Sequence, residues 1–268
     1  QPLLGQAIVV ENRAGAGGMI AAGVVAKGPA DGSMLLIAGQ IIPTAPSLYR
    51  NLPFDPLRDL APVAQVGAAA QVLVVAPNHA AKSVKDLVQM ARRSPGKLNY
   101  ASTGNGSVLQ LSAEMFKIET KTFILQIPYR GSPEAVTAVM TGEVDFLFDN
   151  MVASLPQIKG GKLRALAVTS RQRDPAIPNV PTMVESGFPE FVLATWNGVW
   201  TTGGTPSPVV ARLETELRKV IAMPEVVASI NKTGVKVTNL GSRELAKIIQ
   251  DEAAHWAGVL KYAGVKPQ

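Results

Sequence analysis

The chain has 268 residues, of which 47% are hydrophobic and 17% charged, and this composition excludes a disordered protein. It contains no cysteine, which excludes disulfides, thiolate metal ligands and a cysteine nucleophile, and which fits an oxidising compartment. The net charge of +6 is spread along the chain, and its densest cluster, Arg171-Gln172-Arg173, has no aromatic residues interleaved with it, so we expect no nucleic acid partner.

The first residues predict the end of a helix followed by a buried strand. Leu3-Leu4-Gly5-Gln6 reads as a last helical turn with glycine just beyond it, and residues 7–10 read as the strand. Four residues are too few to nucleate a helix, so we expect a segment of the fold upstream of this start. No apolar run approaches the ~20 residues that cross a bilayer.

Strand patterns then alternate with helical patterns, which is typical of an α/β protein with mostly parallel pairing. The strands are predicted near residues 7–10, 34–37, 63–66, 72–76, 98–101, 123–127, 144–148, 163–168 and 192–200. The helices are predicted near 17–27, 83–94, 107–118, 133–141, 151–158, 207–221, 224–232 and 242–262. Five prolines between residues 43 and 62 predict an irregular connection, and Ser83-Val84-Lys85-Asp86 predicts a capped helix start.

Two glycine-rich loops lie between a predicted strand and a predicted helix. One is Ser102-Thr103-Gly104-Asn105-Gly106-Ser107 and the other is Pro128-Tyr129-Arg130-Gly131. The N–H groups of a helix start have no intrahelical acceptors, so each loop predicts a socket for a carboxylate or another small anion. For Ser107, a simple N-cap role remains the alternative.

Other motifs give little support to catalysis or to a cofactor. Residues 13–18 follow a strand and are rich in glycine, but the third glycine of a dinucleotide fingerprint would fall at Ile20. His79 and His255 stand far apart, and Asp145 and Asp149 have no obvious partner in the sequence. We therefore expect no metal, no cofactor and no catalytic residue.

With these motifs in order, the chain resembles the substrate-binding proteins of tripartite tricarboxylate transporters, the TctC-like or Bug family of periplasmic receptors. The resemblance runs from about Leu4 to Val265. The matching motifs are Glu11-Asn12-Arg13, Gly15-Ala16 and Gly18, Asp31-Gly32, Asp55-Pro56 and Asp59, Gly104-Asn105-Gly106-Ser107, Pro128-Tyr129-Arg130-Gly131, Gly161-Lys162-Leu163-Arg164-Ala165-Leu166-Ala167, and Pro181-Thr182 with Glu185 and Gly187.

The resemblance implies a type II-like periplasmic binding fold, with two α/β domains in a clam-shell that grips its ligand in the interdomain cleft. Domain 1 would comprise residues 1–74 and 195–268, and domain 2 residues 75–194. The ligand would be a small carboxylate, often a dicarboxylate, which a monomeric periplasmic receptor delivers to the membrane permease of the transporter. Family members begin with a strand and a loop that this chain lacks, so the resemblance also implies a missing N-terminal segment.

The ligand-binding residues that follow from the two sockets and the resemblance lie in four groups. They are Gly39 and Gln40; Thr103, Gly104, Asn105, Gly106 and Ser107; Tyr129, Arg130 and Gly131; and Asp149 with Asn150. Arg130 either pairs with a carboxylate or points outward. Two other classes stay open, an enzyme on a similar two-domain scaffold and the ligand-sensing domain of a regulator.

Overall fold

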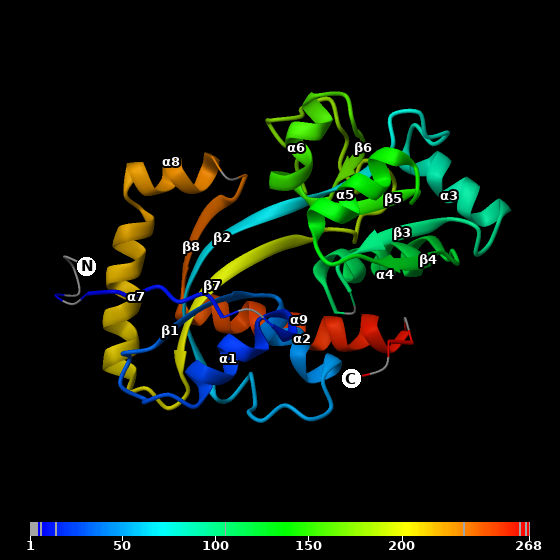
Figure 1. Cartoon of the computed structure of the whole chain (residues 1–268). Coiled ribbons are helices and arrows are strands. Elements are labelled where there is room, and N and C mark those ends of the chain that lie inside the picture. The colour runs from blue at the N-terminus through cyan, green and yellow to red at the C-terminus, as the bar shows by residue number, and fades with distance from the viewer. Residues whose placement is uncertain are drawn as a thin grey trace. The chain divides into compact units, whose positions relative to one another are not determined.

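The computed structural model describes residues 5, 7–13, 15–104, 106–232, 234–262, 264–265 and 267 (Figure 1). The chain divides into two compact units. Unit 1 comprises residues 1–68, 196–258 and 266–268, and unit 2 comprises residues 69–195 and 259–265. The predicted domains, residues 1–74 with 195–268 and residues 75–194, stay a prediction.

Unit 1 contains four strand segments in the order β1, β7, β2, β8. Their bounds are Leu35–Gly39 for β1, Leu60–Val75 for β2, Ala194–Thr202 for β7 and Lys236–Gly241 for β8; β2 and β7 continue into unit 2. The helices are α1 (Met19–Ala26, preceded by a 3₁₀ turn, η1, at Ala16–Gly18), α2 (Ile41–Leu48), α7 (Ser207–Ile221), α8 (Pro224–Lys232) and α9 (Ser242–Tyr262). The β1–β7 and β2–β8 pairs are antiparallel.

Two indole rings form the centre of the unit 1 core. Trp196 and Trp200 have ring centroids 6.4 Å apart, and Leu245 and Ile249 of α9 pack in the same cluster. The indole N–H of Trp200 donates to the Ala38 carbonyl oxygen at 3.2 Å, so the ring is buried without losing its hydrogen bond. Leu245 and Ile249 therefore lie on the face of α9 that packs against this core.

Unit 2 contains the strands β6, β2, β5, β3 and β4 in that order. The bounds are Asn99–Ser102 for β3, Leu125–Pro128 for β4, Phe146–Asn150 for β5 and Arg164–Val168 for β6, with helices α3 (Val84–Arg93), α4 (Val108–Thr120), α5 (Ser132–Thr141) and α6 (Met151–Lys159). The β3–β4 and β3–β5 pairs are parallel, whereas β2 runs antiparallel to both β5 and β6. The sheet is mixed, as predicted.

A cluster of phenylalanines lies in one of the two hydrophobic clusters of unit 2. Phe116 of α4 meets the ring of Phe146 edge-on at 5.8 Å and that of Phe191 at 6.5 Å, and Phe148 stacks on Phe191 at 5.4 Å. Each large aromatic ring removes much apolar surface from water, and edge-on geometry adds a favourable quadrupole contact. This core holds α4 rigidly against β3 and β5, the strands that precede two of the predicted site segments.

Four expectations about the elements need correction. Residues 7–10 form no strand in the described part of the chain; Val9 and Val10 are 81% and 82% exposed, and a strand without a partner gains no ladder hydrogen bonds. The helix end predicted at Leu3, Leu4 and Gln6 lies outside the described residues. β2 runs antiparallel to β5, β6 and β8, whereas the sequence predicted mostly parallel pairing.

The other two corrections concern elements that the sequence did not predict. Helix α2 forms within the proline-rich connection because Pro43 lies in the first turn, where an N–H has no intrahelical acceptor, and because burial of Ile42 and Ala45 offsets the bond lost at Pro46. Strand β8 was missed since its pairing with β2 shifts register between Gln65 and Gly67, which breaks the alternation of apolar and polar residues.

Candidate functional site

Three strands of unit 2 deliver the candidate site to one edge of the sheet. The pairing of β3 with β4 places Ser102 beside Pro128, and the pairing of β3 with β5 places Tyr100 beside Phe146. Because these strands are parallel, the segments that follow them all leave the sheet at its carboxyl edge, where α/β proteins bind ligands. Helices α4, α5 and α6 begin directly after these segments.

The loop after β3 is held by a chain of polar side chains. Ser107 is the N-cap of α4, and its Oγ accepts from the Gln110 N–H at 3.3 Å, so the capping alternative is realised in the structure. The Gln110 Oε1 in turn accepts from the Gly106 N–H at 2.6 Å, and its Nε2 donates to Gln126 Oε1 at 3.0 Å. Gln126 Nε2 donates to Ser102 Oγ at 2.8 Å, which closes the chain beneath the loop.

Two glycines let this loop turn. Gly104 has a φ of 101° and Gly106 a φ of 77°, which is the left-handed region that other residues rarely adopt. Thr103 and Gly104 are partly exposed, Gly106 is buried, and Asn105 lies outside the described residues. The hydroxyl hydrogen of Ser107 is not used by the cap, because a cap oxygen only accepts. The geometry thus leaves this hydroxyl available to an anion at the start of α4.

The loop after β4 is partly occupied by carboxylates of the chain itself. The Arg130 N–H donates to Glu134 Oε2 at 3.1 Å, and the Tyr129 hydroxyl donates to Glu143 Oε1 at 3.0 Å. Burial and the neighbouring Glu143 raise the pKa of Tyr129 to about 12. The Arg130 side chain is exposed and makes no ion pair with the described residues. Gly131 is the N-cap of α5.

Asp149, at the end of β5, is fully buried and is bound by two serines. Its Oδ1 accepts from the Ser132 hydroxyl at 2.8 Å and its Oδ2 from the Ser154 hydroxyl at 2.7 Å. Burial raises the pKa of this carboxyl, although the serine hydrogen bonds act in the opposite direction. Asp149 therefore ties the first turns of α5 and α6 together, while Asn150 occupies the N-cap position of α6 without a side-chain cap hydrogen bond and is partly exposed.

The two candidate residues of unit 1 lie at the end of β1. A Cβ on Gly39 would stand 2.2 Å from the Trp196 carbonyl oxygen, so the close approach of β7 requires glycine there. Gln40 is buried, and its side chain is one of those that stabilise the carboxylate of Glu252 on α9. The Glu252 Oε1 also accepts from the Trp196 indole at 2.8 Å, and burial raises the pKa of Glu252 to about 7.

His79 and Asp145, which had no partner in the sequence, contact each other in the structure. The His79 Nε2 lies 3.4 Å from Asp145 Oδ1, and its Nδ1 accepts from the Ala81 N–H at 3.1 Å. Asp145 Oδ2 also accepts from the N–H of Asn99 at 2.8 Å. Asn99 begins β3 and Asp145 precedes β5, so the pair lies at the amino edge of these strands, opposite the loops.

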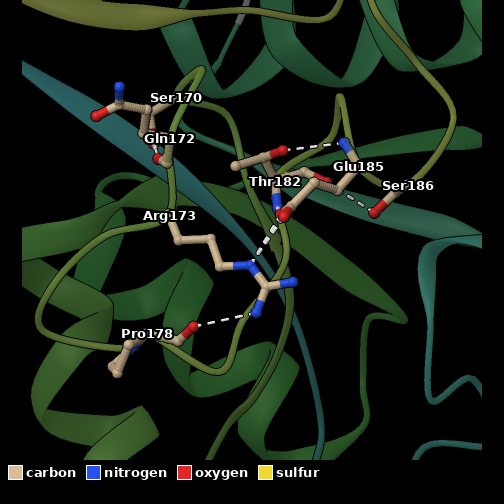
Figure 2. A network of polar contacts seen from close by, with 7 residues as sticks. All are labelled: Ser170, Gln172, Arg173, Pro178, Thr182, Glu185 and Ser186. Atoms are coloured by element: carbon tan, nitrogen blue, oxygen red, sulfur yellow. Dashed lines mark hydrogen bonds and ion pairs between the residues drawn. The ribbon is translucent and has the colours of Figure 1, made fainter.

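A polar network in the segment after β6 accounts for one motif of the sequence, Thr182 with Glu185 (Figure 2). The Glu185 carboxylate accepts from Arg173 Nε at 2.9 Å and from the Thr182 N–H at 2.7 Å, and the Glu185 N–H donates to Thr182 Oγ1 at 3.0 Å. Arg173 also donates to the Pro178 carbonyl oxygen at 3.2 Å. These residues close a long surface connection and have a structural role.

Several polar residues of the site were missed by the sequence analysis. Gln110 could have been found, because Ser107-Val108-Leu109-Gln110 has the spacing of a capping box. Gln71, Ser102 and Gln126 gave no signal, since their partners are remote in sequence. In the described part of the chain no three His, Asp or Glu side chains come together as metal ligands, and no helix is long and apolar enough to cross a membrane.

Comparison with known proteins gives one family for the whole chain. The model of the TctC family, described as the tripartite tricarboxylate transporter family receptor, matches residues 1–265. Protein BugT of Bordetella pertussis is 37% identical over 268 residues, which cover 99% of this chain and 82% of BugT.

Two solved structures are similar along nearly the full length. Rpa4515 of R. palustris, solved with adipate, is 34% identical with a TM-score of 0.87, and the match covers 98% of this chain and 89% of that one. The periplasmic binding protein BugD is 32% identical with a TM-score of 0.85, and the match covers 100% of this chain and 90% of BugD.

Proposed function

The chain belongs to the TctC family of tripartite tricarboxylate transporter receptors, and we propose that it captures a small dicarboxylate for delivery to such a transporter. The observation that carries this proposal is the carboxyl edge of unit 2. Three helix starts and two glycine-rich loops meet there, on neighbouring parallel strands. The partial positive charge of a helix start, together with its free N–H groups, favours a carboxylate over a neutral ligand.

In this proposal the start of α4 makes the main contact with one carboxylate. Thr103, Gly104, Asn105, Gly106 and Ser107 surround it, and Ser107 donates its hydroxyl hydrogen. Tyr129, Arg130 and Gly131 form a wall beside the carboxylate. They donate no hydrogen bond to it from the Arg130 N–H or the Tyr129 hydroxyl, because these groups already donate to Glu134 and Glu143. Asp149 holds α5 and α6 in place and Asn150 faces the ligand, and Gly39 and Gln40 stay predicted ligand-binding residues.

Asp149 supports this arrangement through its position. Its two oxygens accept from the Ser132 hydroxyl at 2.8 Å and from the Ser154 hydroxyl at 2.7 Å, so it fixes the starts of α5 and α6 at this edge. Burial raises the pKa of Asp149, which works against a negative charge beside an anionic ligand.

A solved relative supports the proposed ligand class. Rpa4515, 34% identical, was solved with adipate, a dicarboxylate of six carbons. BugD is a periplasmic binding protein, which supports a periplasmic location for this chain. We further propose a monomeric receptor without catalysis that hands its ligand to the permease. His79 and Asp145 would be the natural acid and base, but they lie at the amino edge of the strands, away from the helix starts.

A thermal-shift screen tests the proposal. The panel comprises mono-, di- and tricarboxylates, with acetate and the diamide of adipic acid as controls that lack a second carboxylate or all charge. A dicarboxylate at one hundred times its Kd should stabilise the protein by about 2.7 kcal/mol, which raises Tm by roughly 5 to 10 °C. A panel in which every acid leaves Tm unchanged refutes the proposed function.

A further inference from the structure

Gln71 of β2 is a buried residue whose backbone is fixed on both sides. Its N–H donates to Thr169 Oγ1 at 2.8 Å, and its carbonyl oxygen accepts from the Thr169 N–H at 2.9 Å. The residue has no exposed surface. The sheet therefore fixes the Cα position of Gln71, which limits the groups that its side-chain amide can reach.

The side-chain amide of Gln71 has only one of its two ends satisfied. Ser112 of α4 lies with its hydroxyl against Gln71 Oε1, and Gln71 Nε2 has no acceptor among the described residues. The Ser112 hydroxyl also lies 2.8 Å from the Val108 carbonyl oxygen and has a single hydrogen to donate. If the amide nitrogen and oxygen of Gln71 were interchanged, the oxygen would be the atom without a hydrogen-bond partner. A buried amide group without a partner is destabilising, and such groups are rare in folded proteins.

The position of this amide connects it to the candidate site. Gln71 lies directly opposite Asn150 in the β2–β5 ladder, and opposite residues present their side chains on the same face of a sheet. Ser112 and Val108 belong to the first two turns of α4, the helix that Ser107 caps. The unsatisfied amide thus belongs to a side chain that contacts the first turns of α4 and lies opposite Asn150, two of the segments to which the carboxylate contacts are assigned.

We propose that Gln71 is a further ligand-binding residue, whose Nε2 donates a hydrogen bond to the carboxylate held at the start of α4, through at most one bridging water. The inference rests on the proposed function. A carboxylate oxygen only accepts hydrogen bonds, so it satisfies the free N–H of Gln71. The cost of the unsatisfied amide is then borne by the empty receptor and is relieved on binding.

The test compares Gln71→Met with the matched variant Gln65→Met, which changes a second buried glutamine of the same strand. Methionine has a similar length and no polar group, and in Gln71→Met the Ser112 hydroxyl keeps the Val108 carbonyl as its acceptor. Gln65 Oε1 accepts from Thr238 Oγ1 at 2.7 Å, so its loss leaves a hydroxyl unpaired. Calorimetric titration with adipate and thermal melting of the empty protein are measured for both variants.

We expect Gln71→Met to bind adipate about 10- to 100-fold more weakly while the empty protein melts at or above the wild-type temperature. Gln65→Met should lower the melting temperature and keep the affinity. The inference is overturned if the affinity of Gln71→Met stays within about twofold of wild type, if Gln65→Met loses as much affinity, or if Gln71→Met melts lower than Gln65→Met. In these cases wild-type binding still supports the proposed function; a wild type that binds no acid overturns both.

A measurement on the wild-type protein covers the case in which Gln71→Met does not fold. The side-chain amide protons of Gln71, followed by NMR in selectively labelled protein, should shift downfield when adipate is added, because they gain a charged acceptor. Resonances that adipate leaves unchanged overturn the inference.

Discussion

Replacement of Ser107 by alanine separates the two roles that the structure gives this residue. As the N-cap of α4, its Oγ accepts from the Gln110 N–H at 3.3 Å. As a proposed ligand contact, its hydroxyl hydrogen is donated to a carboxylate. The first role affects the free energy of unfolding and the second affects the free energy of binding, so Ser107→Ala should change both quantities independently.

The stability loss should be small. The cap hydrogen bond of Ser107 is longer than the equivalent bond in α3, where the Asp86 N–H donates to Ser83 Oγ at 3.1 Å. A serine cap typically contributes about 1 kcal/mol to the unfolding free energy. The bond from the Gly106 N–H to Gln110 Oε1 does not involve Ser107 and should persist. We therefore expect Ser107→Ala to cost about 0.5–1 kcal/mol in unfolding free energy.

The binding loss should be larger. A hydrogen bond to a charged acceptor contributes about 1.5–3 kcal/mol, so the affinity for a dicarboxylate should fall by a factor of about 10 to 100. Ser83→Ala is the matched control, because it removes a serine cap from another helix of unit 2 that follows none of the site loops. The unfolding free energy of Ser83→Ala should fall by a similar amount, and its affinity for the dicarboxylate should stay at the wild-type value.

Urea unfolding gives the first quantity and isothermal titration with adipate gives the second. If Ser107→Ala and Ser83→Ala lose equal stability and both bind as wild type does, Ser107 is a cap alone and the start of α4 makes no hydroxyl contact with the ligand. If Ser83→Ala also binds weakly, the affinity reports general loosening of unit 2 and the reasoning fails.

Gly106→Pro should reduce the affinity for dicarboxylates at least tenfold in titration calorimetry, because proline cannot adopt a φ of 77° and removes the N–H bound to Gln110; wild-type affinity would place the loop outside the site. Glu252, whose pKa burial raises to about 7 from an ordinary value of 4.5, contributes stability that is fully present below pH 4.5 and is lost as the pH rises through about 7. The unfolding free energy of the wild type should thus fall by roughly 3 kcal/mol between pH 4.5 and 8, and Glu252→Gln should remove most of this fall when urea unfolding is measured across that pH range. If the unfolding free energies of wild type and Glu252→Gln change with pH in parallel, Glu252 is not the titrating group. His79→Ala should lower the unfolding free energy by about 1 kcal/mol, since Asp145 loses a partner, and should leave binding unchanged; a weakened affinity would bring the amino edge into the site.

Much of the fold could be predicted where one local signal dominated. The apolar stripe of residues 242–262 predicts the bounds of α9, and Ser83 with Asp86 predicts the start of α3. The local sequence pattern did not predict elements whose formation depends on pairing with a strand that is remote in sequence. Residues 7–10 have strand composition but no pairing partner in the described chain, and β8 exists only because β2 accepts it through a register shift.

The candidate site divides in the same way. Glycines between a strand and a helix are visible in the sequence, so the loops at residues 102–107 and 128–131 were found. Gln71 was not, because its significance depends on Ser112 and on Thr169, which is 98 positions away. Nor could the sequence show that Glu134 occupies the Arg130 N–H, which moves the expected carboxylate contact toward α4.

A crystal structure of the protein with bound adipate tests the central claim most directly. We predict one carboxylate of the ligand at the start of α4, with its oxygens about 3 Å from the Ser107 hydroxyl and from N–H groups of the first helical turn. An adipate bound elsewhere, with the start of α4 free of any carboxylate, would contradict it.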